Sequence, residues 1–233
     1  MTRPVTASSH ILFVGNSYTS RNNLPRLVSD LAATAATPRQ LHTQTIVAGG
    51  ASLKRHWNAG KVQAALASAS WDYVVLQEQS TLPWKSPSRY QESVRLFDAA
   101  IRAHGAKTVL YLTWSRRESP EKQGAITRTV ETIAAEVDAI VVPVGPAWHV
   151  AMRKDPGIAL YVEDGSHPSP AGSYLAACVF EVFLFDERGA GRSVSDALGL
   201  ERAVADRLQS IAWGLRGSRR TGFAERSSQA AST

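Results

Sequence analysis

Residues 11–19 read Ile-Leu-Phe-Val-Gly-Asn-Ser-Tyr-Thr, an apolar run that stops at a glycine and continues into a polar turn. A short buried strand that ends in this way projects the next side chains over the end of a sheet, where a nucleophile can meet substrate. Ser17 is therefore the first candidate for catalysis. Serine is also common in turns rich in glycine and asparagine for conformational reasons alone, so this stretch leaves both interpretations open.

The rest of the chain alternates apolar runs with amphipathic segments. Further strands are predicted at about 41–48, 73–76, 108–113 and 139–144, and helices at about 24–31, 54–68, 88–104 and 121–137 and from Pro170 onward. Strands that alternate with helices of this length favour right-handed crossovers and a parallel sheet. We predict the fold class α/β, a three-layer α/β/α sandwich with a five-stranded, mostly parallel sheet, in a single domain over residues 1–215.

Composition limits the classes of function. The chain has 233 residues, of which 44% are hydrophobic and 20% charged, as in an ordinary globular protein. Its formal charge is +6, but the segment 216–233 holds four arginines and one glutamate and so accounts for +3. The body is only mildly basic and lacks the basic stripe that binds nucleic acid. The segment 216–233 is also nearly without apolar residues, and we predict that it is a disordered tail.

The positions of cysteine and histidine and the hydropathy pattern exclude further classes of function. Cys178 is the single cysteine, so no intrachain disulfide can form. The scattered His42, His56, His104 and His149 show no metal-binding spacing, and we expect neither a metal nor another cofactor. The opening residues lack the apolar core of a secretory signal, and no run approaches the roughly 20 apolar residues that span a bilayer. We expect a cytoplasmic protein without a membrane partner.

A second polar motif lies towards the other end of the chain, where residues 163–169 read Glu-Asp-Gly-Ser-His-Pro-Ser. A serine hydroxyl is a weak nucleophile at neutral pH, so it needs a base within hydrogen-bond reach, and that base needs a partner that fixes its tautomer. His167 and Asp164 can supply these roles for Ser17. Ligands of parallel sheets bind beyond the carboxyl ends of the strands, and we expect the two motifs to meet there. Asp164 followed by glycine is also a good turn pair by itself.

The two motifs together resemble the SGNH (GDSL-type) hydrolase superfamily, in which a nucleophilic serine near the N-terminus is followed much later by Asp-x-x-His. Residues 15–17, Gly-Asn-Ser, match the first block of a Gly-Asn-Ser variant subgroup, with asparagine in place of the usual aspartate, and residues 164–167 match the last block. Gly50 resembles the glycine of the second block. The third block, Gly-x-Asn-Asp in the family, reads Gln-Glu-Gln-Ser at 77–80, with Gln79 at the asparagine position. The resemblance spans residues 11 to about 180 and implies a flavodoxin-like fold.

The same resemblance implies an oxyanion hole, which ester cleavage requires because negative charge develops on the carbonyl oxygen. The expected donors are the backbone amides of Ser17 and Gly50 and the side-chain amide of Gln79. Gln77 is the alternative side-chain donor, since glutamine is one methylene longer than asparagine. Three further residues are candidates for substrate contact, with core packing as the alternative for the two aromatic ones: Gln77, Tyr18 and Trp114.

These residues predict a serine esterase that cleaves a small carboxylic ester, such as an acylated carbohydrate or an aryl or alkyl ester, through an acyl-serine intermediate. An acyltransferase with the same triad and a non-catalytic ligand-binding module on this fold are the alternatives. The expected partner is a small-molecule ester, and the sequence indicates no oligomeric state. Arg116 and Arg117, after the fourth strand, favour a solvated loop pair over a site for an acidic group.

Overall fold

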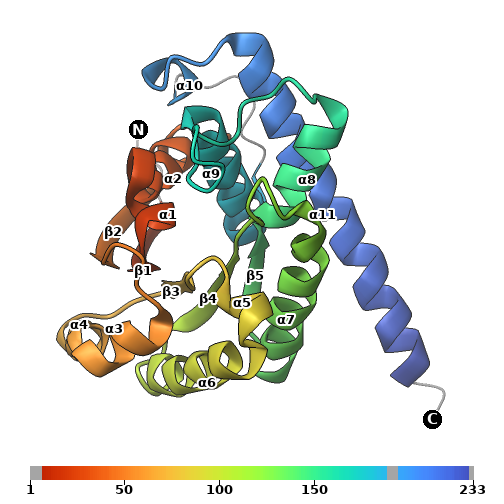
Figure 1. The fold of residues 1–233 in the computed structure, drawn as a ribbon. Helices are drawn as coiled ribbons and strands as arrows, with labels where there is room; N and C mark the ends of the chain where they lie inside the picture. Colours follow the sequence, from red (N-terminus) through yellow and green to blue (C-terminus); the bar gives the residue numbers. More distant parts are fainter. Residues whose placement is uncertain (1–6, 188–193, 231–233) are drawn as a thin grey trace, which may run out of the picture.

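The protein is built on one five-stranded parallel sheet with the strand order β2-β1-β3-β4-β5 (Figure 1). A computed structural model describes residues 7–187 and 194–230, with side-chain surroundings as far as residue 216. The strands are β1 Ala7–Gly15, β2 Arg39–Val47, β3 Tyr73–Leu76, β4 Lys107–Leu112 and β5 Ile140–Pro143. The predicted α/β fold with a five-stranded sheet is confirmed, and every pairing is parallel.

The central position of β1 explains why its sequence is so apolar. It pairs with β2 on one side and β3 on the other, and residues 11–14 are fully buried. Successive side chains of a strand point to opposite faces of the sheet. Ile11 and Phe13 accordingly enter one core, while Leu12 and Val14 enter the other. A strand buried on both faces reads as a continuous apolar run, which is the pattern that the sequence shows.

Helices cover both faces and complete three layers. One face carries α2 Leu24–Ala33, α8 Val144–Lys154, α9 Pro170–Phe185 and α11 Arg202–Ala230. The other carries α3 Leu53–Ala59, α4 Lys61–Ser68, α6 Pro87–Ala103 and α7 Gln123–Glu136. Four short helices, α1 Ser17–Ser20, η1 Arg21–Asn23, α5 Leu82–Lys85 and η2 Pro120–Lys122, lie in loops that follow strands, and α10 Val194–Ala197 precedes α11.

The prediction of one helix over residues 54–68 is wrong, because the segment forms two. Gly60 separates α3 from α4 and lies at a φ of 69°. This left-handed backbone conformation is accessible to glycine and terminates a helix. Helix α8 was not predicted either, since it begins directly after β5 without a polar cap.

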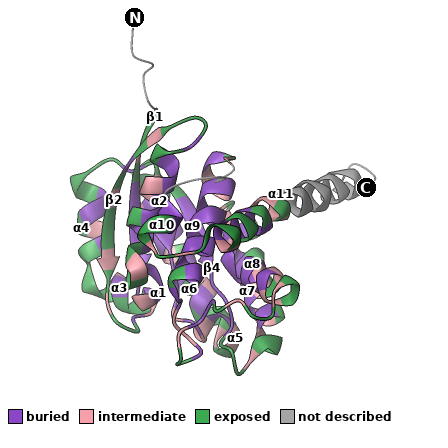
Figure 2. Ribbon diagram, turned by 90° about the horizontal axis from the view of Figure 1, so that it is seen from above, coloured by how far each residue is buried: buried purple, intermediate pink, exposed green. Residues whose placement is uncertain are grey.

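Helix α9 is the buried centre of its layer (Figure 2). Of its 16 residues, 13 are buried, because α2, α8 and α11 all pack against it. The helix begins at Pro170, as the sequence predicts, and Ser169 caps it by accepting a hydrogen bond from the Gly172 amide at 3.1 Å. A Cβ at Gly172 would lie 2.4 Å from the Leu160 carbonyl oxygen and 2.5 Å from Trp148. The first turn of α9 therefore packs closely on the core, which fixes the loop immediately before it.

In the described part of the C-terminal helix α11, as far as residue 216, the buried residues are Ala205, Leu208, Gln209, Ile211 and Ala212. Its helical backbone is assigned as far as Ala230. The predicted disordered tail, 216–233, falls almost entirely on residues whose side chains lie outside the described part of the chain. The domain boundary at residue 215 therefore stays a prediction. Among the described residues, no helix is long and apolar enough to cross a membrane.

Candidate active site

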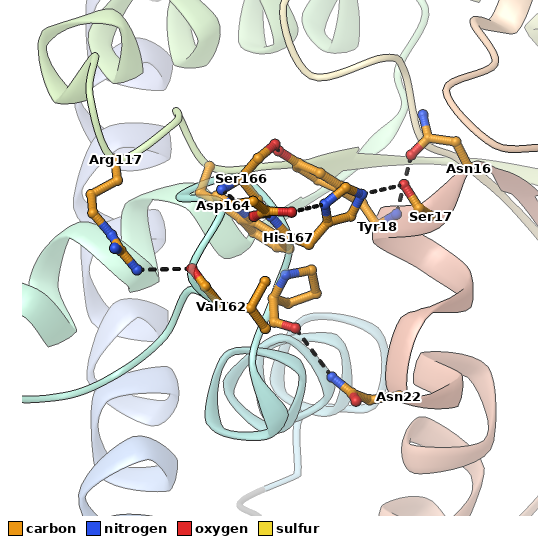
Figure 3. Close-up of polar contacts among 11 residues, drawn as sticks. Asn16, Ser17, Tyr18, Asn22, Arg117, Val162, Asp164, Ser166 and His167 are labelled. Carbon is orange, nitrogen blue, oxygen red and sulfur yellow. Dashed lines mark hydrogen bonds and ion pairs between the residues drawn. The ribbon is translucent and has the colours of Figure 1, made fainter.

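Ser17, His167 and Asp164 form one hydrogen-bonded chain at the carboxyl edge of the sheet (Figure 3). The distance from Ser17 Oγ to His167 Nε2 is 2.8 Å, and His167 Nδ1 lies 2.6 Å from Asp164 Oδ2. Ser17 and His167 are half-buried, whereas the Asp164 side chain is 47% exposed. The structure thus brings together the two motifs that the sequence separates by about 150 residues.

Asp164 is held in place by hydrogen bonds to its second oxygen. Its Oδ1 accepts from the backbone amides of His167 and Ser166, at 2.9 and 2.8 Å. The bond from the His167 amide, then the His167 ring and the Ser166 amide, lower the pKa of Asp164 below its usual range. The carboxylate therefore stays ionised, so it accepts the Nδ1 proton of His167 and leaves Nε2 free to accept from Ser17.

The loop that carries His167 is a tight turn. Gly165 lies at a φ of 65°, which favours glycine, and its amide donates to the Val162 carbonyl. The Val162 amide in turn donates to the His167 carbonyl at 3.0 Å. Asp164 and Gly165 thus form a turn, and Asp164 also supplies the carboxylate that binds His167. The two interpretations of this sequence motif, a turn and a partner for the histidine, are therefore compatible.

The turn that carries Ser17 depends on Asn16 and Gln77. Asn16 caps α1 by accepting from the Tyr18 amide, and its Nδ2 donates to the Ala51 carbonyl at 3.0 Å. The Gln77 side chain is fully buried, and its Oε1 accepts from the Asn16 amide and from Thr19 Oγ1, both at 2.9 Å. A Cβ at Gly15 would lie 2.6 Å from Gln77 Oε1, so the glycine is needed for this close approach.

Gln77 and Gln79 therefore occupy different environments. Gln77 Nε2 donates to the Glu78 carbonyl, so both ends of this buried amide are used within the protein. Gln79 is half-buried, and its Oε1 accepts from the Thr81 amide, the Thr81 hydroxyl and the Leu82 amide. Within the described residues its Nε2 group has no hydrogen-bond partner. Gln79 is thus held by its oxygen with its donor end free, whereas Gln77 is a structural residue with no end left for substrate.

Two backbone amides near Ser17 complete the candidate oxyanion donors. Ser17 is the first residue of α1, so its N–H group has no helical carbonyl to bind. Gly50 is exposed and lies at a φ of 62° after β2, and no carbonyl in the described part of the chain accepts from its amide. The three donors predicted from the sequence, the two amides and Gln79, are thus free of competing partners.

Tyr18 and Trp114, predicted as substrate contacts, are instead buried in an aromatic stack. Tyr18 stacks on Trp114 with ring centroids 4.7 Å apart, and Trp114 stacks on Trp148 at 3.7 Å. Tyr18 is 4% exposed and Trp114 is 1% exposed, so neither offers a face to a substrate. Both hold Ser166: the Tyr18 hydroxyl lies 2.7 Å from Ser166 Oγ, and Trp114 Nε1 donates to the Ser166 carbonyl at 2.9 Å. Both rings therefore pack in the core, which was the alternative to substrate contact.

Two further residues anchor the same loop and were not predicted. Asn22, at a φ of 52°, donates through Nδ2 to the Pro168 carbonyl (Figure 3). The same Nδ2 atom donates to Ser173 Oγ. Arg117 donates from its guanidinium to the Val162 carbonyl and from its backbone amide to the Gly165 carbonyl. The consecutive asparagines at 22 and 23 were an available signal, because asparagine tolerates left-handed backbone. Nothing in the sequence marks the role of Arg117.

A serine, a histidine and an aspartate linked in this order at the carboxyl edge of a parallel sheet define a serine hydrolase. Within the described residues, no group of three or more histidines, cysteines or acidic residues lies together to hold a metal ion.

Comparison with known proteins agrees with this class. No family model matches the chain and no curated protein matches it, but solved structures do. A protein from Slackia heliotrinireducens assigned to the SGNH hydrolases is 32% identical, with a TM-score of 0.65, over 76% of this chain and 99% of that chain. The chain therefore belongs to the SGNH hydrolase family. It is a serine hydrolase of the class that acts on carboxylic esters.

Two more distant structures share the fold. A DUF4886 family protein from Bacteroides uniformis aligns with a TM-score of 0.73 at 19% identity, over 89% of this chain and 94% of that chain. Axe2, an acetylxylan esterase from Geobacillus stearothermophilus, aligns with a TM-score of 0.63 at 15% identity, over 77% of this chain and 96% of that chain.

Proposed function

We propose that the protein hydrolyses a small carboxylic ester, such as an acylated carbohydrate or an aryl or alkyl ester, through an acyl-serine intermediate on Ser17. The observation that carries this proposal is the unbroken chain of hydrogen bonds from Ser17 Oγ through His167 to Asp164. Its geometry lets the imidazole accept the serine proton at Nε2 while Nδ1 stays bonded to an ionised carboxylate.

In the first half-reaction, Ser17 Oγ attacks the ester carbonyl carbon as its proton moves to His167 Nε2. The carbonyl oxygen becomes negatively charged in the tetrahedral intermediate, and the free donors of Ser17, Gly50 and Gln79 support an oxyanion hole for it. His167 then gives its proton to the departing alcohol oxygen, which leaves an acyl group on Ser17. In the second half-reaction, a water molecule gives a proton to His167 as its oxygen attacks the acyl carbon. The tetrahedral intermediate then collapses, His167 gives that proton to Ser17 Oγ, and the carboxylic acid and the free serine are released.

Turnover of p-nitrophenyl esters of increasing acyl length, with the Ser17→Ala variant alongside, tests the proposal. We expect hydrolysis by the unmodified protein, highest for short acyl groups, and almost none by Ser17→Ala. A fluorophosphonate should also label Ser17 and abolish the activity. Absence of both turnover and labelling in the folded protein would instead indicate a non-catalytic binding module.

Adding alcohols to the same assay separates hydrolysis from acyl transfer. A hydrolase should release free acid at a rate that the added alcohol leaves largely unchanged. If a new ester formed in preference to the acid, the second acceptor would be the alcohol and the protein would be an acyltransferase with the same triad.

A further inference from the structure

Glu78 is a buried carboxyl group that the mechanism above does not use. It is 4% exposed and lies directly after β3, between Gln77 and Gln79. No positively charged side chain pairs with it among the ion pairs of the described residues. Burying a carboxyl group without a countercharge is unfavourable, so its hydrogen bonds indicate what it does.

One oxygen of Glu78 joins two loops. Its Oε1 accepts from the backbone amide of Gln79 at 2.6 Å and from the backbone amide of Leu53 at 3.1 Å. Gln79 carries the candidate side-chain oxyanion donor, and Leu53 lies three residues after Gly50, which carries a candidate backbone donor. These loops follow different strands, β3 and β2, which are separated in the sheet by β1.

The loop that carries Gly50 is also held by a second side-chain hydrogen bond to a neighbouring segment. Asn16 Nδ2 donates to the Ala51 carbonyl, so this loop is fixed to the serine turn at Ala51 and to the β3 end at Leu53. Removing the Glu78 bond would leave the Gly50 segment without its direct hydrogen bond to the β3 end, while the Ala48 amide still donates to the Gly15 carbonyl and Lys54 still pairs with Glu92. The spacing between Gly50 and Gln79 therefore depends on Glu78.

We propose that Glu78 is a positioning residue that sets the distance between the two halves of the oxyanion hole by binding the Leu53 and Gln79 amides with one carboxylate oxygen. The proposal rests on the proposed function, because it assigns a role in the same oxyanion site. A displacement of about 1 Å in groups that stabilise a transition state can lower turnover by about 10²-fold, so a tie of this kind affects rate without contacting substrate.

The charge of this carboxyl group makes the role testable by pH. Burial raises the pKa of Glu78 to about 7, against the opposing effect of the two amide bonds. Glu78 lines a cavity of about 440 Å³ together with Lys54, Arg89 and Glu92, which gives protons access to it, and the buried Tyr90 hydroxyl also feels its charge. An ionised carboxylate binds backbone amides more strongly than a neutral acid does. The tie should therefore be strong above pH 7 and weaker below it.

The test compares kcat and KM for aryl ester hydrolysis in the unmodified protein, Glu78→Gln and Glu78→Ala between pH 5.5 and 8.5. Glutamine resembles the protonated form of Glu78, so the ratio of kcat between the unmodified protein and Glu78→Gln cancels the contribution of His167. We expect a ratio of about tenfold at pH 8.5 that approaches one at pH 5.5, with KM nearly unchanged. For Glu78→Ala we expect a loss of kcat of about 10²-fold.

An alkyl trifluoromethyl ketone provides an independent readout, because it forms a tetrahedral adduct whose oxyanion needs the same donors. Its inhibition constant should rise in proportion to the loss of kcat, while KM does not. Asp98→Asn is the matched control: Asp98 is also a buried carboxylate, bonded to Thr108 and Arg102 far along α6, and its loss should change stability and not kcat.

The outcomes separate the proposal from the proposed function. If the unmodified protein is active and the Glu78→Gln ratio is the same at every pH, or if the Glu78 variants lose no more kcat than Asp98→Asn, the positioning role is wrong. If the unmodified protein neither hydrolyses esters nor binds the ketone, the esterase assignment is wrong and the positioning role falls with it.

Discussion

At the scale of single residues, Gln77 and Gln79 have the same side chain two positions apart, but the protein uses them differently. Both amide ends of Gln77 are consumed inside the serine turn. Among the described residues, the side chain of Gln79 is bonded only through its oxygen, which accepts hydrogen bonds from backbone amides of the loop that follows. The difference arises because β3 ends at Leu76, so Gln77 still lies against β1 whereas Gln79 lies beyond the sheet.

Gln79→Ala should lower kcat for aryl esters by about 10²- to 10³-fold, roughly 3 to 4 kcal/mol of transition-state stabilisation, with slow fluorophosphonate labelling of Ser17 preserved. Gln77→Ala should act mainly through stability, because it leaves the buried Asn16 amide without its acceptor. Steady-state kinetics and thermal melts of the two purified variants check this. A large loss of turnover in Gln77→Ala with near-normal rates in Gln79→Ala would show that the side-chain oxyanion donor is Gln77 and not Gln79.

Glu78 also carries a prediction about stability. Its pKa in the folded protein is raised from 4.5 to about 7, so its stabilising contribution is present at low pH and is lost as the pH rises through 7. Glu78→Gln removes the buried charge, so the variant should gain up to roughly 3 kcal/mol relative to the unmodified protein at pH 8.5 and little at pH 5. Urea unfolding at the two pH values measures the difference. An equal effect at both would mean that Glu78 does not titrate in this range.

At the scale of elements, the loop before α9 is fixed by contacts from several parts of the chain. Tyr18 of α1, Asn22 of η1 and the β4–α7 segment with Trp114 and Arg117 all bind it. These contacts place His167 more firmly than the exposed Asp164 alone could do. The loop is therefore a rigid support for His167, even though part of it faces solvent.

Tyr18→Phe tests this support, because phenylalanine keeps the stack on Trp114 and loses only the hydroxyl, which bonds Ser166 and Ser80. A typical hydrogen bond contributes about 0.5 to 1.5 kcal/mol, so we expect kcat to fall by about 2- to 10-fold with KM nearly constant. Tyr174→Phe is the control, since it removes a buried hydroxyl bonded to Gln209 away from the site. If both variants changed kcat equally, the Tyr18 hydroxyl would have no special role in placing His167.

The elements also show how far sequence reasoning reaches. The inner strands β1, β3 and β4 were predicted well, because a strand buried on both faces leaves a continuous apolar run such as residues 11–14. The break at Gly60 was missed, since an isolated glycine within a helical pattern is usually tolerated. Ser17, Asp164 and His167 could be proposed as one site because the chemistry of a triad restricts the residue types, and in the structure they are hydrogen-bonded to one another. The anchors Asn22 and Arg117 act on backbone carbonyls, which any sequence provides, so their partners leave no pattern.

At the scale of the whole molecule, α11 packs on α9 and α8 and closes one layer. Up to residue 216, where the described side chains end, its last buried residue is Ala212, and the half-buried Arg216 pairs with the exposed Asp186 and lies over Trp213. Exposed pairs contribute about 0 to 1 kcal/mol. Truncation after Leu215 should therefore shift the melting temperature by no more than about 4 °C and leave ester turnover unchanged. A larger drop, measured by calorimetry, would mean that the segment 216–233 docks on the body.

The central claim is that Ser17, His167 and Asp164 act as one catalytic unit. Members of a triad depend on one another, so their losses do not multiply. The most direct measurement is kcat/KM for a short aryl ester in Ser17→Ala, His167→Ala and the double variant, with circular dichroism to confirm that each is folded. We predict that each single variant loses nearly all activity and that the double variant is little worse than either. Losses that multiply in the double variant would contradict the claim, because they would show that the two residues contribute independently.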